Sequence, residues 1–286
     1  MNNNADRFLS GKVFRREFLR QSAGLAAVFH FSGENLRAGG SQSEAVTPTK
    51  LIKLFNGKDL SGLYTWSKET GYDDPEKVFT VQDGSLWIKG NPSGYIATEK
   101  SYQNYHLITE FKWGEEVYGS KTVRNSGILL HATGPDGNRN PWMASLECQL
   151  AQGCVGDFIV IRGKDADGAT IPVDITSDTV LGPDNRTRWK KGGQPTSYAG
   201  KQFWWSQHDP EFEELIDTSG RWDAESPLGQ WTRVECIATG GTMTVIVNGT
   251  VVNECYDVFP ASGKILLQSE GFEILFRRFD LQPLKT

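Results

Sequence analysis

The sequence predicts an all-β domain, a sandwich or a barrel, over most of its 286 residues. From Leu51 onward apolar and polar residues alternate with a period of two, which is typical of strands. Glycine is abundant, with 31 residues, and methionine is rare, with 3, as in proteins with many short strands and tight turns. The sequence shows neither βαβ alternation nor an internal repeat, and its length suits one large sandwich.

Two dipeptides mark the tightest expected turns, Asp83-Gly84 and Asn248-Gly249. Both favour the positive φ angles of two-residue hairpins, so we expect a strand on either side of each. The other expected strands are 105–113, 127–132, 145–150, 231–238, 264–269 and 272–281.

Residues 182–229 interrupt this pattern with proline, glycine, tryptophan and charged residues that show no strand periodicity. Within them, residues 209–216 could form a short helix. A long irregular insertion in a compact domain is often a lid or a binding loop.

The N-terminal residues are interpreted as a targeting signal. Residues 14–20, with paired Arg15 and Arg16, match a twin-arginine export signal, and the short apolar stretch 22–29 follows. An amphipathic surface helix is the alternative. We therefore expect a periplasmic or extracellular protein. The expected organisation is a signal segment 1–37, a linker 38–50 and the β domain 51–285.

Composition argues against several classes of partner. The net charge is −5 and no long basic run follows residue 20, so no nucleic-acid partner is expected. The sequence has no stretch of 18 apolar residues, so no membrane span is predicted. Cys148, Cys154, Cys236 and Cys255 lack the CxxC pairs of a zinc site, and either two disulfides or buried free thiols fit them.

Strand alternation places polar residues together on one face of the predicted sheets. Glu147 and Gln149 point away from Leu146 and Cys148, for example. A solvated outer face is one interpretation. A functional cleft is the other, because the set mixes Glu, Gln, His and Arg at short intervals. The same alternation adds Asn125, His131, Gln268, Glu270 and Arg277 to the set.

Standard catalytic motifs are missing from the sequence, among them GxSxG, HExxH and the P-loop. The Glu-x-Asp-x-x-Glu strand of laminarinase-type glucanases is absent too, since Cys148 and Gln149 follow Glu147. A glycosidase mechanism with two carboxylates therefore lacks its obvious pair.

Six segments, in order, resemble the 3-keto-disaccharide hydrolase domain family over roughly residues 51–285. The resemblance implies a concanavalin-like jelly roll of two antiparallel sheets with the ligand on the concave face. The segments are 54–62, 125–128, 147–150, 231–235, 247–249 and 263–278.

The resemblance also implies an enzyme that cleaves 3-keto-glycosides or 3-keto-disaccharides. A C3 keto group makes the C2 proton acidic, so a base can remove it and the enolate can expel the C1 substituent; adding water completes a net hydrolysis. His131 or Glu147 would be the base and Arg277 would hold the enolate oxygen. A divalent metal is left open as a Lewis acid, with no ligand set predicted.

The remaining candidates would bind the carbohydrate. Asp157 either caps a turn or joins the site, and His208 either closes over the sugar or lies in a surface loop. A non-catalytic carbohydrate-binding module is the rival function, and a structural domain of a surface complex is a third. The expected substrate-binding residues are Asn125, Gln149, Asp157, His208, Gln268 and Glu270.

Replacing both Arg15 and Arg16 with Lys is expected to leave the precursor in the cytoplasm, because the paired guanidinium groups are the recognised feature. Fractionation and immunoblotting measure this, with a Lys53→Arg variant as the matched control. Unchanged export of the double variant would refute the assignment.

Overall fold

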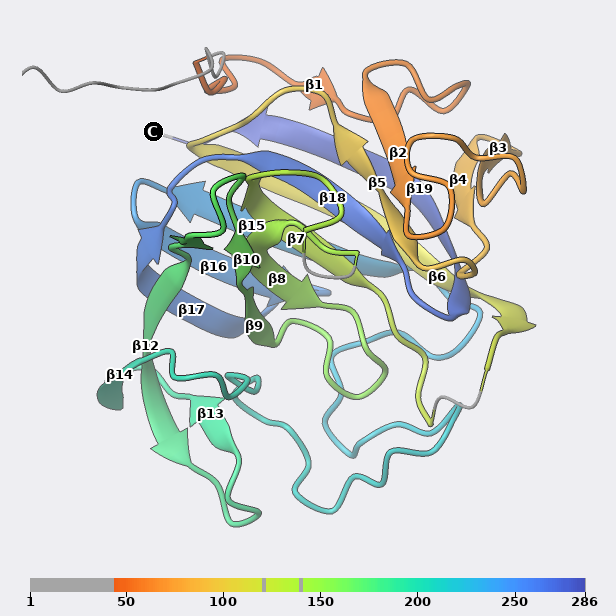
Figure 1. Ribbon diagram of the computed structural model, residues 1–286. Coiled ribbons are helices and arrows are strands. Elements are labelled where there is room, and N and C mark those ends of the chain that lie inside the picture. The colour runs from red at the N-terminus through yellow and green to blue at the C-terminus, as the bar shows by residue number, and fades with distance from the viewer. Residues whose placement is uncertain (1–43, 120–121, 139–140, 286) are drawn as a thin grey trace, which may run out of the picture. The chain divides into compact units, whose positions relative to one another are not determined.

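A computed structural model describes residues 44–119, 122–138 and 141–285, and the strands of this part form two antiparallel sheets packed face to face (Figure 1). The described residues contain no helix, and therefore no helix that could span a membrane. The predicted all-β sandwich is confirmed. The predicted signal segment 1–37 lies outside the described residues.

The smaller sheet has six strands and carries most of the predicted polar set. Its order is β2 (Leu63–Ser67), β5 (Gly94–Thr98), β18 (Lys264–Ser269), β7 (Gly127–Thr133), β8 (Ala144–Gln149) and β9 (Phe158–Ile161). A two-stranded ribbon of β10 (Gly163–Lys164) and β11 (Thr170–Ile171) follows β9 in the chain.

The larger sheet has eleven strands and forms the opposite layer. Along its main path the order is β13 (Thr187–Trp189), β12 (Asp174–Leu181), β17 (Thr250–Phe259), β16 (Thr242–Val247), β15 (Thr232–Thr239), β6 (Tyr105–Val117), β19 (Phe272–Pro283), β4 (Ser85–Ile88) and β3 (Phe79–Gln82). Off this path, β1 (Ile52–Lys53) pairs with β19, and β14 (Gln194–Ser197) pairs with β12.

The core lies between the sheets, where alternate residues of each strand meet. Ile128 and Leu146 of the smaller sheet belong to the same buried cluster as Phe111 and Val234 of the larger one. Full burial of such a side chain contributes about 1.5–3 kcal/mol, so this layer stabilises the sandwich. The four cysteines are free and buried.

Both predicted hairpin turns are present. Asp83 and Gly84 join β3 to β4 with φ angles of 49° and 74°, and Asn248 and Gly249 join β16 to β17 with 47° and 84°. Two successive residues with positive φ characterise the type I′ turn, whose twist matches that of the strands it joins.

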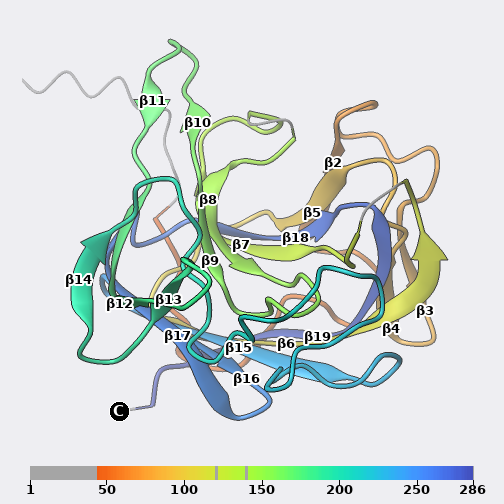
Figure 2. The same cartoon turned by 90° about the horizontal axis from the view of Figure 1, so that it is seen from below.

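The smaller sheet is curved, with β2 and β8 rising on either side of β7 and β18 (Figure 2). Strand register sets the order of residues across it. Gly127 is the partner of Gln149 on β8, and Leu129 is the partner of Glu147. On the other side of β7, Leu267 is paired with Ile128, which brings Gln268 beside Gly127.

The insertion 182–229 is less irregular than predicted, because β13 and β14 lie within it. The short helix suggested for 209–216 is absent. The Asp209 carboxylate accepts a hydrogen bond from the Glu211 amide at 3.0 Å and pairs with Arg221 at 2.8 Å, which fixes a turn instead.

A β-bulge turns His131 away from the concave face on which alternation had placed it. The pairing of β7 with β8 shifts between Leu130 and Thr133, and His131 has a φ of 53°. Its ring lies edge-on to Tyr105, which belongs to the core, with 5.7 Å between ring centroids. The placement of His131 in the cleft is therefore wrong, since a bulge breaks the period of two.

The same burial makes His131 sensitive to acid. Its side chain is 1% exposed, and Nδ1 lies 2.9 Å from the carbonyl oxygen of Pro260. Burial lowers its pKa from 6.5 to about 4, against the opposing effect of that hydrogen bond. Between these two values the unfolded chain takes up the proton first, so His131 makes the fold less stable as pH falls.

We expect a His131→Phe variant to lose less stability than the wild type between pH 7 and pH 5. The neutral ring of His131 contributes about 2 kcal/mol of this pH dependence at pH 5, and Phe contributes none. Other groups titrate in both proteins, so the difference between their Tm–pH curves isolates His131. Parallel curves would contradict the assignment.

Candidate functional site

A hollow of about 620 Å³ lies on the concave face of the smaller sheet. It brings together five of the nine residues that the sequence analysis selected. Three further residues with polar or aromatic side chains border it: Trp142, Arg162 and Tyr198. The five predicted residues are Asn125, Glu147, Gln149, Gln268 and Glu270.

The centre of this hollow is built over Gly127. A Cβ atom on Gly127 would stand 2.3 Å from Oε1 of Glu147 and 2.4 Å from Oε1 of Gln268. Side chains from the two neighbouring strands thus lean toward each other across β7, into space that any larger residue would occupy. The glycine allows a carboxylate and an amide oxygen to converge on one point.

Two buried acceptor oxygens border the hollow without a hydrogen-bond partner in the described part of the chain. Oε1 of Gln268 and Oδ1 of Asn125 have no hydrogen-bond partner among the described residues, and Gln268 is 1% exposed. An unsatisfied buried acceptor costs about 1–3 kcal/mol, so a ligand that donates hydrogen bonds here is favoured. The oxygen of Gln149 is engaged by the Leu150 amide at 3.0 Å.

These oxygens are also the ligand type that calcium or magnesium takes, yet the set is small. The Glu147 carboxylate and the Gln268 amide oxygen converge over Gly127, and Asn125 and Glu270 also line the hollow. Among the described residues, nowhere do three or more His, Cys, Asp or Glu side chains gather as a metal site would require. Any cation bound here would depend heavily on water or on the substrate for its ligands.

A second hollow of about 340 Å³ adjoins the first and shares Asn125 and Gln149 with it. The insertion forms one of its walls through Gln202, Trp204 and Glu214. Its other lining residues include Thr122, Val123, Ala151 and Cys154. We call the first hollow the sheet compartment, the second the insertion compartment, and the two together the groove.

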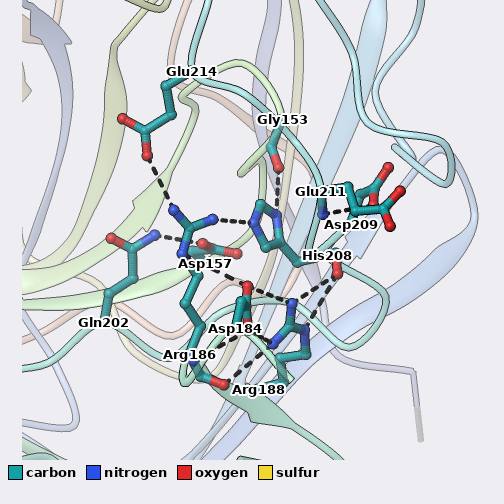
Figure 3. A network of polar contacts seen from close by, with 10 residues as sticks. All are labelled: Gly153, Asp157, Asp184, Arg186, Arg188, Gln202, His208, Asp209, Glu211 and Glu214. Atoms are coloured by element: carbon teal, nitrogen blue, oxygen red, sulfur yellow. Dashed lines mark hydrogen bonds and ion pairs between the residues drawn. The ribbon is translucent and has the colours of Figure 1, made fainter. Parts of the chain in front are cut away.

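Arg186 contacts His208 and Glu214, the latter a lining residue of the insertion compartment (Figure 3). Its guanidinium carbon lies 4.2 Å from the centroid of the Trp204 ring. Nη1 donates to Nε2 of His208 at 2.6 Å, and Nη2 donates to Glu214 at 3.5 Å. Arg188 stabilises the same region through a bidentate pair with Asp184 at 2.6 and 2.9 Å.

His208 supports Trp204 rather than closing over a ligand. Because its Nε2 accepts from Arg186, its Nδ1 carries the proton and donates to the Gly153 carbonyl at 3.1 Å. Its ring centroid lies 4.3 Å from that of Trp204. Burial, with Arg186 and Arg188 nearby, lowers its pKa to about 4. His208 is therefore neutral and fully engaged, in a buried network and not in a surface loop.

Asp157 is an anchor beneath the groove. Its carboxylate is 0% exposed and accepts hydrogen bonds from the Gln202 side chain and, at 2.7 Å, from the Trp205 amide. Burial raises its pKa to about 8, although the two hydrogen bonds and nearby Arg186 act in the opposite direction. Asp157 was expected to cap a turn or to join the site, but it lines neither hollow and acts indirectly, because it holds Gln202.

Arg277 lies on the other sheet, so the expected convergence of His131, Glu147 and Arg277 is wrong. Its Nε donates to Glu110 at 2.6 Å, and its guanidinium lies 4.6 Å from the Trp231 ring. The side chain is 47% exposed on the outer face of β19. Alternation identified a polar face there, but it does not tell which of two sheets carries that face.

A third hollow, of about 780 Å³, lies near the end of β6 and is bordered by Trp87, Arg124 and Glu273. Its buried charges are engaged by the protein. Oε2 of Glu273 accepts from the Glu115 amide at 2.8 Å, and Nε of Arg124 pairs with Asp217 at 2.7 Å. It is larger than either compartment of the groove but, among the described residues, offers a ligand fewer unsatisfied groups.

Solved structures similar to this chain include two putative glycosyl hydrolases and a carbohydrate-binding module. A putative glycosyl hydrolase from Parabacteroides distasonis ATCC 8503 has 19% sequence identity and a TM-score of 0.50, covering 82% of this chain and 94% of its own. A second from the same organism has 18% identity and a TM-score of 0.47, covering 82% and 100%. A CBM66 carbohydrate-binding module from Bacillus subtilis has 8% identity and a TM-score of 0.42, covering 77% and 94%.

No curated protein matches the sequence. The model of one family, described as the 3-keto-alpha-glucoside-1,2-lyase-like domain, matches residues 50–282. That range contains both sheets, both compartments of the groove and the whole insertion. The chain belongs to this 3-keto-disaccharide hydrolase domain family.

Proposed function

We propose that the protein cleaves 3-keto-glycosides by elimination, with Glu147 as the base. The observation that carries the proposal is the convergence of the Glu147 carboxylate with the Gln268 amide oxygen over Gly127, inside the groove. The family description names a 1,2-lyase-like domain, which agrees with removal of a proton from C2 and departure of the group on C1.

The reaction can be written with this chain's residues. Glu147 takes the C2 proton, and the C2–H electron pair forms an enolate with the C3 carbonyl. The enolate then re-forms the ketone, the C1–O bond breaks, and the leaving oxygen takes up a proton. An unsaturated 3-keto sugar and a free alcohol result. Addition of water across the new double bond would make the overall change a hydrolysis.

The enolate oxygen needs a hydrogen-bond donor. Arg277 lies on the other sheet, so another residue must supply that donor. Tyr198 and Arg162 line the sheet compartment with Glu147. Burial raises the pKa of Tyr198, so its hydroxyl keeps its proton at neutral pH. Arg162 is 46% exposed and pairs with Asp174 at 3.2 Å, which leaves other N–H groups for a ligand. We assign the stabilising role to these two residues.

The unsatisfied oxygens of Gln268 and Asn125 suit sugar hydroxyls, which donate hydrogen bonds. They also suit a carbohydrate-binding module, and this is the specific observation that favours the alternative function. A module would need these contacts and aromatic side chains, but no base.

We further propose that the protein acts outside the cytoplasm, because residues 14–20 match a twin-arginine export signal.

A Glu147→Gln variant is expected to keep its Tm and to lose about 10²–10⁴ of its turnover, because Gln preserves the shape but cannot take the proton. Purified protein is incubated with 3-keto-sucrose, 3-keto-trehalose and 3-keto-lactose, and monosaccharide release is measured with and without EDTA. Loss of activity with EDTA would assign a divalent metal a role. Binding without cleavage by the wild type would favour the module.

An Arg277→Ala variant serves as the matched control on the opposite sheet. We expect turnover within about twofold of the wild type and a change in stability below about 1 kcal/mol, since its ion pair is exposed. Measuring kcat/KM and Tm on the same preparation tests both. A hundredfold loss of kcat/KM with unchanged Tm would return Arg277 to the site.

A further inference from the structure

We propose that the insertion compartment binds the leaving group as a second hydroxylated sugar ring, and that Trp204 determines this specificity. The inference rests on the proposed function, because it takes the scissile bond to lie between the two compartments. Three features of the groove support it.

The first feature is the division of chemical groups between the compartments. Glu147, Arg162 and Tyr198 line the sheet compartment and not the insertion compartment. The proton to be removed and the keto group must therefore lie over the sheet. Asn125 and Gln149 line both compartments and mark where one passes into the other. A substituent on C1 that extends beyond them enters the insertion compartment.

The second feature is the support of Trp204. The residue is half-buried and lines the compartment, so part of its indole faces the space. Arg186 and His208 pack against the ring system, with centroid distances of 4.2 and 4.3 Å. The backbone amide of Trp204 also donates to the Thr187 carbonyl at 2.9 Å. An indole held in this way is a preformed platform that loses little conformational entropy when a ring stacks on it.

The third feature is the polar surround of that platform. Gln202 is held by the buried Asp157 carboxylate, and Glu214 reaches the same space with only a 3.5 Å contact to Arg186. Together with Asn125 and Gln149 they offer several amide and carboxylate groups beside one aromatic ring. A purely apolar leaving group would displace water from these groups without replacing its hydrogen bonds, which is unfavourable. A sugar ring offers an apolar face to the indole and hydroxyls to its neighbours.

The test compares leaving groups of different size. In the wild type, kcat/KM is measured for a 3-keto-disaccharide and for methyl 3-keto-glucoside, whose methyl group does not fill the insertion compartment. We expect Trp204→Ala to lower kcat/KM about tenfold for the disaccharide and to leave the methyl glycoside within about twofold. Trp204→Phe, which keeps an aromatic face, should recover most of the loss.

Trp222→Ala is the matched control. Trp222 belongs to the same insertion and stacks with Arg221 at 4.7 Å, but it is 50% exposed and does not line the groove. It should leave both substrates unaffected. Equal losses on both substrates in Trp204→Ala, or no loss on either, would overturn the proposal. A larger loss on nitrophenyl 3-keto-glucoside than on the disaccharide would do so too, because it would indicate an aromatic leaving group.

A binding measurement separates this inference from the proposed reaction. Titration with an unoxidised disaccharide and with methyl glucoside, followed by NMR, reports on the compartment without any cleavage. If the wild type cleaves no 3-keto substrate, the proposed function fails. The compartment assignment still stands if Trp204→Ala weakens binding of the disaccharide alone, and it falls if both ligands bind equally well to the variant and the wild type.

Discussion

The register of β18, β7 and β8 is the constraint on which the rest of the site depends. It sets Gln268, Gly127 and Gln149 in one row and Glu147 in the next, all facing away from the core. A slip of one residue would place these polar groups between the sheets and expose their apolar neighbours. The hydrophobic effect that drives the two sheets together therefore also fixes the groups of the groove, and Gly127 gives them room to meet.

The insertion is held by different forces, since it has little regular structure to bury its polar groups. Arg186 and Asp157 each lie at the centre of several hydrogen bonds, and both are fixed by partners within the protein. The raised pKa of Asp157 and the lowered pKa of His208 have the same cause, burial that disfavours charge. Both groups are held by hydrogen bonds within the protein, so we assign neither of them the proton transfer.

Much of this arrangement follows from alternation in the sequence, and the exceptions have physical causes. Asn125, Glu147, Gln149, Gln268 and Glu270 were predicted because each lies on or beside a strand of the smaller sheet. Alternation placed His131 on the wrong face because a β-bulge interrupts β7, and a bulge has no clear signal in the sequence. Arg277 does lie on a polar strand face as alternation predicts, but that strand, β19, belongs to the larger sheet. Trp204, Gln202 and Glu214 lie where no periodicity exists, and only the tryptophan-rich composition of the insertion could have drawn attention to them.

The proposed function places two requirements on the structure. Groups for proton transfer need fixed distances, and a sheet supplies them because each strand is held by two neighbours. Groups that select a substituent would lie in the insertion, which lies outside the smaller sheet and can change without altering the register of β18, β7 and β8. Asn125 and Gln149 belong to both compartments, so a ligand that contacts the insertion is also positioned relative to Glu147. In the proposed reaction, binding energy from the distal part of the substrate would in this way orient the C2 proton toward Glu147.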